Sequence, residues 1–305
     1  TALTHHLREC MEKPVRISLV LGSGGARGLA HIGVIHWLEE NGFEITSIAG
    51  CSMGALVGGV HAAGKLDEFE QWFRAIDRMD ILRFLDISWR PSGLVKGDRI
   101  IDALVELVGD RSIEDLPIPF TAVAANLDTG KEVWFQSGRL FDAIRASISL
   151  PFFFTAFDYK GQSLVDGGVL YPVPIAPTFG DHNDLTLAVS LGGEAEDLPE
   201  QKARKPELDS PLQEIAARIS GFFQNLSIGD LDQTRKELGI YEVALRSFDA
   251  MQNTIARQKL AAYPPDFELE IPRPICETLD YHLADEMIEF GYRRAQERLG
   301  KVKDS

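Results

Sequence analysis

Two glycine-rich turns, each placed directly after an apolar run, constrain the fold of this 305-residue chain. The apolar run 15–21 leads into the turn 22–28 (GSGGARG), and the run 45–49 leads into the turn 50–54 (GCSMG). A stretch with helical character follows each turn. This alternation of strand, turn and helix predicts a mainly parallel sheet with helices on its faces. In such a sheet both turns lie at the carboxyl edge of the strands, where ligands bind.

The same pattern continues as far as residue 192. The chain predicts further strands and helices at 66–76, 98–108 (a helix with Asp98 as its N-cap), 120–126, 131–136, 141–148, 157–165 and 185–191. The predicted fold is three-layer α/β/α with a mainly parallel central sheet, formed by residues 14–192.

Beyond residue 192 the composition changes. Residues 193–211 are polar and contain prolines, which is typical of a linker or mobile loop. Residues 212–305 predict a mostly helical region that packs on the core, with a short strand at 267–271 and a closing helix at 280–299. Its two amphipathic stretches, 212–226 and 238–255, are expected to cover the sheet; a homodimer contact or a membrane contact through them stays open.

Charge and composition exclude some classes of partner. The net charge of −15 argues against nucleic acid and against electrostatic recruitment to anionic lipid. No apolar run approaches the ~18 residues that span a bilayer, and the first 14 residues lack a signal-peptide core. Three scattered cysteines indicate neither a disulfide framework nor a zinc site. We therefore expect a cytoplasmic protein without metal or cofactor, whose membrane contact would be peripheral, local and apolar.

The turn 50–54 has the pattern Gly-x-Ser-x-Gly between a strand and a helix, which is the pattern of a nucleophile elbow. Gly50 and Gly54 allow a tight turn, and the helix that follows directs N–H groups and its positive dipole end toward the Ser52 hydroxyl. The alternative is a glycine-rich turn with an incidental serine.

The turn 22–28 admits two functional interpretations. The first is a dinucleotide or phosphate cradle. Gly22 and Gly24 match the start of that pattern, but the third glycine is Gly28 rather than a glycine at position 27, and no Walker lysine follows. As an oxyanion hole, its consecutive glycines leave several N–H groups free to converge on one point. That interpretation needs a nucleophile on the adjoining strand, and Ser52 is there.

A carboxylate follows a later strand, in the motif Asp166-Gly167-Gly168. Asp-Gly most often forms a solvated turn, and that alternative stays open here. Two apolar segments could provide walls for a site. Phe152 to Phe154 precede the motif, and residues 79–94 could line an acyl pocket, form a lid or belong to the ordinary core.

With these three motifs the chain resembles the bacterial members of the patatin-like phospholipase family. The resemblance covers about residues 14–192, which would form the catalytic domain. It consists of an oxyanion loop (Gly24, Gly25, Ala26, Arg27 and Gly28), the nucleophile motif Gly50–Gly54 and the catalytic motif Asp166–Gly168. Ser23 departs from the pattern, because many relatives have a further glycine there. Arg27 is expected to orient the loop, to meet an anionic head group or to form a structural salt bridge.

The resemblance implies a Ser52–Asp166 dyad that cleaves fatty-acyl esters of phospholipids, lysophospholipids or related lipids through an acyl-enzyme. An aspartate of ordinary pKa, near 3.9, is a weak base for a hydroxyl, so the site should be dry and apolar. A Ser–Asp–His triad with His182 or His282 is a minor alternative. Two further alternatives are a nucleotide-binding protein that uses the 22–28 loop and a non-catalytic acyl-binding or regulatory protein.

Overall fold

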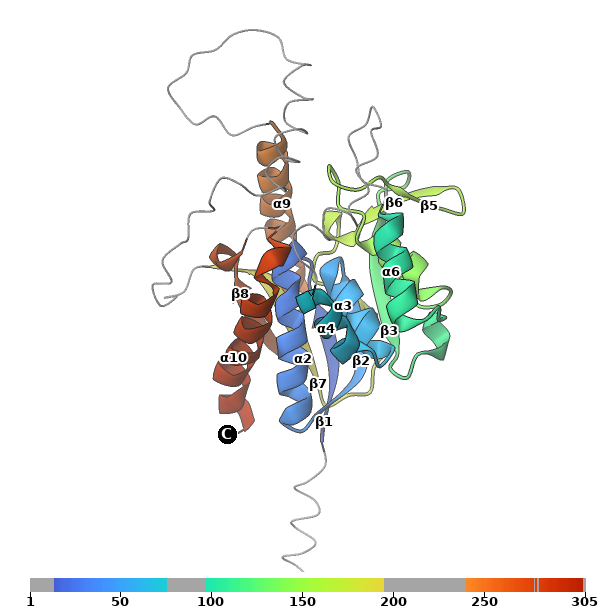
Figure 1. Ribbon diagram of the computed structural model, residues 1–305. Coiled ribbons are helices and arrows are strands. Elements are labelled where there is room, and N and C mark those ends of the chain that lie inside the picture. Colours follow the sequence, from blue (N-terminus) through green and yellow to red (C-terminus); the bar gives the residue numbers. More distant parts are fainter. Residues whose placement is uncertain (1–13, 76–96, 195–239, 277, 279, 304–305) are drawn as a thin grey trace, which may run out of the picture.

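In the computed structural model the described residues are 14–75, 97–194, 240–276, 278 and 280–303 (Figure 1). They form one mixed sheet in the order β5-β6-β3-β2-β1-β7-β8, and β4 also pairs with β3. The predicted segments 79–94 and 212–226, and all but the first two residues of 193–211, lie outside the described residues.

The centre of the sheet is parallel, because every strand pair from β3 through β2, β1 and β7 to β8 runs in the same direction. These strands are β1 (Val15–Leu21), β2 (Phe43–Cys51), β3 (Phe120–Asn126), β7 (Leu185–Gly193) and β8 (Phe267–Pro272). The antiparallel edge consists of β4 (Lys131–Phe135), β5 (Phe157–Tyr159) and β6 (Gln162–Asp166). Strand β8 shows that the chain beyond residue 192 contributes to the sheet itself.

Helices cover both faces of the sheet, so the predicted three-layer α/β/α class is confirmed (Figure 1). One face carries α2 (Ala30–Glu40), α3 (Met53–Ala62), α7 (Leu140–Ser147) and α10 (Ala284–Lys303), which packs along α2. The other face carries α9 (Ile240–Ala262), which packs with Ala256 and Leu260 against Val20 and Ala188 of the sheet. Helices α4 (Leu66–Ala75) and α6 (Asp98–Val108) border the first face.

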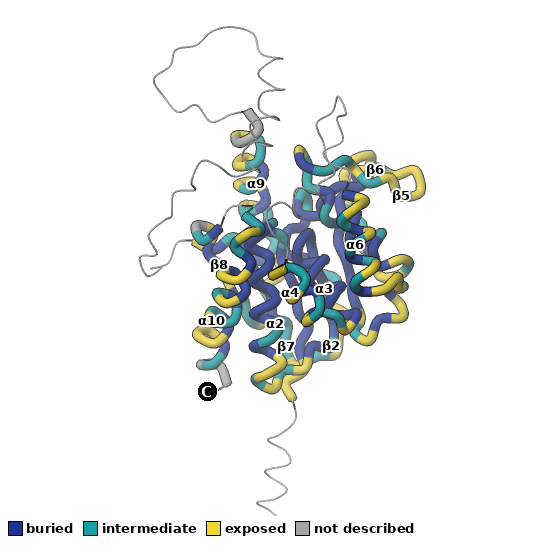
Figure 2. Tube along the Cα trace, in the orientation of Figure 1, coloured by how far each residue is buried: buried dark blue, intermediate teal, exposed yellow. Residues whose placement is uncertain are grey.

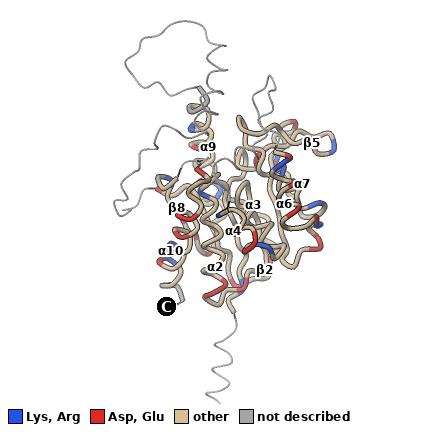
Figure 3. The backbone as a smooth tube through the Cα atoms, in the orientation of Figure 1, with Lys and Arg blue, Asp and Glu red and all other residues tan. Residues whose placement is uncertain are grey.

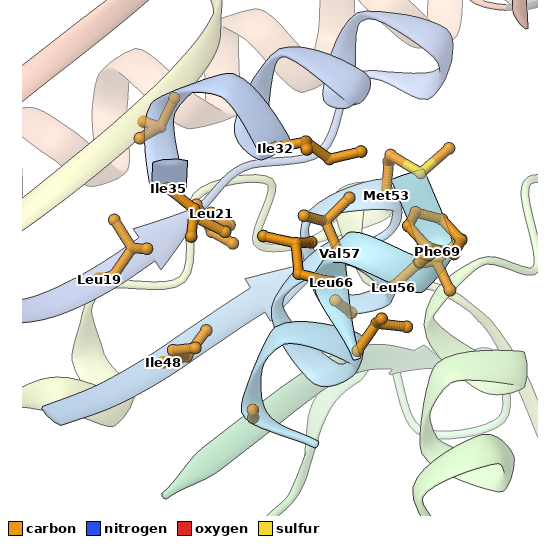
Figure 4. Packing of buried hydrophobic residues seen from close by; sticks show 14 of the residues in the cluster. Leu19, Leu21, Ile32, Ile35, Ile48, Met53, Leu56, Val57, Leu66 and Phe69 are labelled. Atoms are coloured by element: carbon orange, nitrogen blue, oxygen red, sulfur yellow. The ribbon is translucent and has the colours of Figure 1, made fainter. Parts of the chain in front are cut away.

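The alternation of side chains along the strands creates these two packing faces. Leu19, Leu21 and Ile48 point to the α2/α3 side and are buried among Ile32, Val57 and other apolar side chains (Figure 4). The central strands are dark in the burial view and carry few charges, which collect on the outer helices and loops (Figures 2 and 3). Burial of residues 17–21 on both faces explains why β1 appears in the sequence as a largely apolar run.

The helix predicted at 98–108 is present, but the prediction that Asp98 is its N-cap is wrong. Gly97 occupies that position with φ 74°, and Asp98 is the first helical residue. Glycine enters the left-handed region at little cost, so the chain turns one residue earlier. Asp98 still lies at the positive end of the helix dipole. Over the described residues, no helix combines the length and apolar character needed to cross a bilayer.

Candidate active site

Ser52 lies at the junction of β2 and α3 in a strained backbone conformation, with φ 56° and ψ −124°. Its N–H donates to Ser147 Oγ at 2.9 Å, and Ser147 Oγ donates in turn to the Val123 carbonyl at 2.6 Å. The turn is tight, because a Cβ on Gly50 would lie 2.4 Å from the Gly54 carbonyl oxygen. Strain of this kind persists only where neighbours enforce it, and it is concentrated at functional sites.

Asp166 ends β6 and is completely buried. Its Oδ2 accepts a hydrogen bond from Ser52 Oγ at 2.5 Å, and its Oδ1 accepts one from the Gly168 N–H at 2.7 Å. The Cys51 thiol lies 3.8 Å from Oδ1 as a third, weak donor. The solvated-turn alternative is therefore wrong, and Gly167 begins a short 3-10 turn that folds back over the carboxylate.

Burial changes the acid–base properties of this carboxylate. Removal from water raises the pKa of Asp166 from its ordinary 3.8 to about 6, although the hydrogen bonds from Ser52, Gly168 and Cys51 oppose the rise. A carboxylate of this basicity accepts a proton from a hydroxyl more readily than a solvated one. Burial and the nearby Asp166 charge also raise the pKa of the Cys51 thiol, which stays protonated and able to donate.

The glycine-rich loop follows β1 and passes beside Ser52 as a 3-10 helix, Gly25–Leu29. The N–H of Ser23 donates to the Pro172 carbonyl at 2.8 Å, and the N–H of Ala26 donates to the Thr278 carbonyl at 2.9 Å. Between them, the N–H groups of Gly24 and Gly25 have no acceptor within the described part of the chain. These two N–H groups are unpaired, whereas the Ala26 N–H anchors the loop to Thr278.

Arg27 is almost fully buried and points away from solvent. Its Nε donates to the Gly24 carbonyl at 3.2 Å, and its Nη2 lies 2.7 Å from Asp249 Oδ1 on α9. Asp249 Oδ2 also pairs with Arg273 at 2.7 Å. Of the three roles expected for Arg27, orienting the loop and forming a structural salt bridge match this geometry.

A cavity of about 110 Å³ opens beside Ser52. Most of its wall is apolar and comes from Met53, Leu56, Phe69, Trp72, Phe73, Ile100, Leu104, Ile148, Leu150, Phe153, Phe154, Leu245, Phe248 and Tyr281. The polar part of the wall consists of Ser23, Arg27, Asp249, Gln252 and Thr278. Of the predicted aromatic wall, Phe153 and Phe154 line the cavity, whereas Phe152 has φ 70° and is 48% exposed. The mostly apolar lining beside Ser52 suits an apolar ligand.

Several residues of the site were not found from the sequence. Ser147 holds the Ser52 backbone, and Asp249 and Gln252 reach the site from α9. By contrast, the N–H groups expected from the helix after the elbow are those of Met53 and Gly54, which have no acceptors inside α3.

The two candidate histidines occupy different places. His182 lies in the loop before β7, where its carbonyl accepts a hydrogen bond from Arg16 at the start of β1, the end of the strand away from Ser52. His282 follows Tyr281 of the cavity wall in a 3-10 turn. In the described structure Ser52 Oγ and Asp166 Oδ2 are in direct contact, with no imidazole between them.

Comparisons with known proteins agree with the motifs. A family model described as patatin-like phospholipase matches residues 19–179. An uncharacterised NTE family protein of Mycobacterium bovis is 41% identical, over 93% of this chain and 91% of that protein. Lysophospholipase NTE1 of Pyricularia oryzae is 27% identical, over 94% of this chain and 19% of that protein. The crystal structure of VipD from Legionella pneumophila aligns with a TM-score of 0.47 and 15% identity, over 95% of this chain and 67% of that one.

Proposed function

Because the chain belongs to the patatin-like phospholipase family, we propose that it is a serine hydrolase of fatty-acyl esters in phospholipids, lysophospholipids or related lipids. Family membership supports lipid hydrolysis in general. The single observation on which the detailed proposal depends is the 2.5 Å contact between Ser52 Oγ and Asp166 Oδ2 beside an apolar cavity. A nucleophile and a base within hydrogen-bond distance are the minimum for covalent catalysis of acyl transfer.

The first half-reaction acylates Ser52. Its Oγ attacks the ester carbonyl carbon while its proton passes to Asp166 Oδ2, whose raised pKa makes that transfer less unfavourable. The carbonyl oxygen becomes an oxyanion, and in this proposal the unpaired N–H groups of Gly24 and Gly25 stabilise it. One such donor typically contributes about 10²–10³ in kcat. The bond to the alcohol oxygen then breaks as Asp166 returns the proton to it.

The second half-reaction releases the acid. Asp166 takes a proton from water, the resulting hydroxide attacks the acyl-enzyme carbonyl, and the Ser52 oxygen leaves with the proton. The apolar wall of the cavity holds the acyl chain during both steps and keeps the carboxylate poorly hydrated. Relatives that carry the name lysophospholipase support a lipid with one acyl chain as the first substrate to test.

The nucleotide-binding alternative has less support. The cationic group of the loop, Arg27, is already paired with Asp249, and the cavity beside the loop is mostly apolar. A triphosphate or pyrophosphate needs unpaired donors and cations rather than aromatic walls. A non-catalytic acyl-binding protein would use the same cavity, so only reactivity at Ser52 separates it from the hydrolase.

A fluorophosphonate probe tests this reactivity directly. The wild-type protein should be labelled at Ser52 and should release fatty acid from a lysophospholipid, whereas Ser52→Ala should do neither. Asp166→Asn should remain folded and should lose most of the hydrolysis. If wild-type protein binds the lipid but is neither labelled nor active, the acyl-binding alternative replaces the hydrolase.

A further inference from the structure

Gln252 of α9 lies where three parts of the candidate site meet. Its side chain lines the cavity that also contains Ser52. Its Oε1 accepts a hydrogen bond from Ser23 Oγ of the glycine-rich loop at 3.5 Å. Its Nε2 packs against the backbone of Gly168, so closely that a Cβ on that glycine would lie only 2.0 Å from the nitrogen. The second glycine of the Asp-Gly-Gly motif thus provides the space for this amide.

The amide has an unused donor. Gln252 is only 8% exposed, and Nε2 is buried without a hydrogen-bond partner within the described residues. A buried donor left unpaired is destabilising, and native proteins seldom tolerate such groups without a reason. Gln252 lines the cavity beside Ser52, so a small rotation of its side chain would present this donor to an acceptor on a bound ligand.

The direction of the proposed reaction indicates which part of a substrate lies there. Asp166 must return a proton to the leaving alcohol oxygen, so the alcohol half of the ester lies on the Asp166 side of Ser52. The Gly168 N–H is bonded to Asp166 Oδ1, and Gln252 contacts Gly168. The acyl half of the substrate is apolar, and the aromatic wall around Phe69 and Phe73 offers it apolar contacts.

We propose that Gln252 Nε2 donates a hydrogen bond to an oxygen of the alcohol half of the ester, beyond the scissile bond. This inference rests on the proposed hydrolase function and adds a substrate preference to it. Esters of a polyol such as glycerol present a hydroxyl or further ester oxygen at that position, and esters of a plain alkyl alcohol do not. Gln252 is therefore a specificity residue that favours glycerol esters, with Ser23 holding the amide in orientation.

A pair of matched substrates isolates this contact. 1-Octanoylglycerol and propyl octanoate have the same acyl chain and a three-carbon alcohol, and they differ only in the two hydroxyl groups. Wild-type kcat/KM should favour the glycerol ester. Gln252→Met, which keeps the length of the side chain but removes the donor, should lose roughly tenfold on the glycerol ester, the cost of one hydrogen bond at such a site. It should stay within about threefold of wild type on the propyl ester.

Two further variants complete the test. Gln252→Leu also removes the donor and adds no charge beside Asp166, so it should show the same selective loss. Met251→Leu changes the neighbouring, exposed residue of α9 and should leave both rates unchanged. Equal losses on both esters would make Gln252 a structural residue, and no loss on either would mean that its amide does not contact the substrate. Either result would overturn the inference. A wild-type protein that cleaves neither ester and is not labelled by the fluorophosphonate would overturn the hydrolase function, and the inference with it.

Discussion

Arg27 and Asp249 form an ion pair with Nη2 and Oδ1 2.7 Å apart, and their side chains are only 6% and 18% exposed. The first belongs to the glycine-rich loop beside Ser52 and the second to α9, so the pair joins the loop to the opposite layer of the fold. Arg273 binds the other oxygen of the same carboxylate. Asp249 thus pairs with two arginines and attaches the glycine-rich loop to α9.

Removing that aspartate should affect both stability and catalysis. Asp249→Ala leaves Arg27 buried without its partner, and we expect a loss of about 2 kcal/mol in the free energy of unfolding. This is below the ~3–5 kcal/mol of a fully buried pair, since Asp249 retains some solvent contact. A less ordered loop should also lower kcat/KM by roughly tenfold, in line with partial loss of one oxyanion donor. Urea unfolding and esterase kinetics measure the two effects.

Asp285→Ala is the matched control for Asp249→Ala. Asp285 pairs with Arg74 on the surface and is 69% exposed, so its loss should cost no more than about 1 kcal/mol and leave activity intact. If the two variants behave alike, Arg27 does not depend on Asp249.

The raised pKa of Asp166 predicts how activity depends on pH. The carboxylate must be ionised to accept the Ser52 proton, so kcat/KM should rise with pH through a midpoint near 6. A solvated aspartate would instead give a midpoint near its ordinary 3.8. A profile with a short-chain ester, recorded from pH 4 to 9, distinguishes the two. A flat profile across pH 5 to 7 would contradict the buried base.

The same carboxylate should make Asp166→Asn more stable than the wild type in alkaline solution. Between pH 4 and 6 folded Asp166 keeps a proton that the unfolded chain has released, so its contribution to stability is lost as pH rises through about 6. Asparagine removes this penalty, which is on the order of 3 kcal/mol for a shift of this size. Melting temperatures should therefore differ at pH 8 and converge below pH 4. An asparagine variant that is less stable at pH 8 would refute the prediction.

Ser147 should matter for turnover although it is remote from any substrate. Its hydroxyl bonds the Ser52 N–H and the Val123 carbonyl, and it is completely buried. Ser147→Ala removes the partner of the Ser52 N–H, at about 1–3 kcal/mol, and allows the strained Ser52 backbone to relax. We expect kcat to fall at least tenfold with little change in KM, as steady-state kinetics would report. Ser47→Ala removes another buried hydroxyl, farther back along β2, and should lose stability while keeping kcat.

The histidine variants separate a dyad from a triad. His182→Ala and His282→Ala should both retain activity within about twofold of wild type, because the Ser52 proton passes directly to Asp166. Ester hydrolysis and probe labelling should be measured on each. A loss of several orders of magnitude in either variant, with the fold intact by circular dichroism, would restore the triad.

The sequence was sufficient for those features that are local in the chain. Residues 15–21 and 120–126 match β1 and β3 in full, because strands buried on both faces leave a continuous apolar signature. The elbow and the Asp-Gly-Gly motif place a nucleophile and a carboxylate at strand ends that the sheet order then brings together. That β3 pairs with β6 and delivers Asp166 to Ser52 could not be predicted without the topology.

The residues that α9 contributes to the site could not be predicted from the sequence, for a different reason. Asp249 and Gln252 are three residues apart on one helix face, but nothing nearby in the sequence marks them as facing Arg27 or Ser23. Their partners lie 222 and 229 positions earlier in the chain. The amphipathic pattern correctly indicates a helix that packs on the sheet, and a polar residue on its inner face gives no sign of which group it meets. The hydrogen bond from the Ala26 N–H to Thr278 could not be predicted either, because its acceptor is a backbone carbonyl, which every residue type has.

The attachment of the loop to Asp249 and Thr278 has a consequence for biosynthesis. A ribosome delivers Ser52, the glycine-rich loop and Asp166 long before it delivers α9 and the turn at 278, so a growing chain lacks the groups that hold the loop in place. We expect nascent and prematurely terminated chains to be inert toward fatty-acyl esters, which a chain stopped at residue 239 would test. The order of the sequence would thus delay reactivity until translation is nearly complete, and spare the cell's own lipids from half-made enzyme.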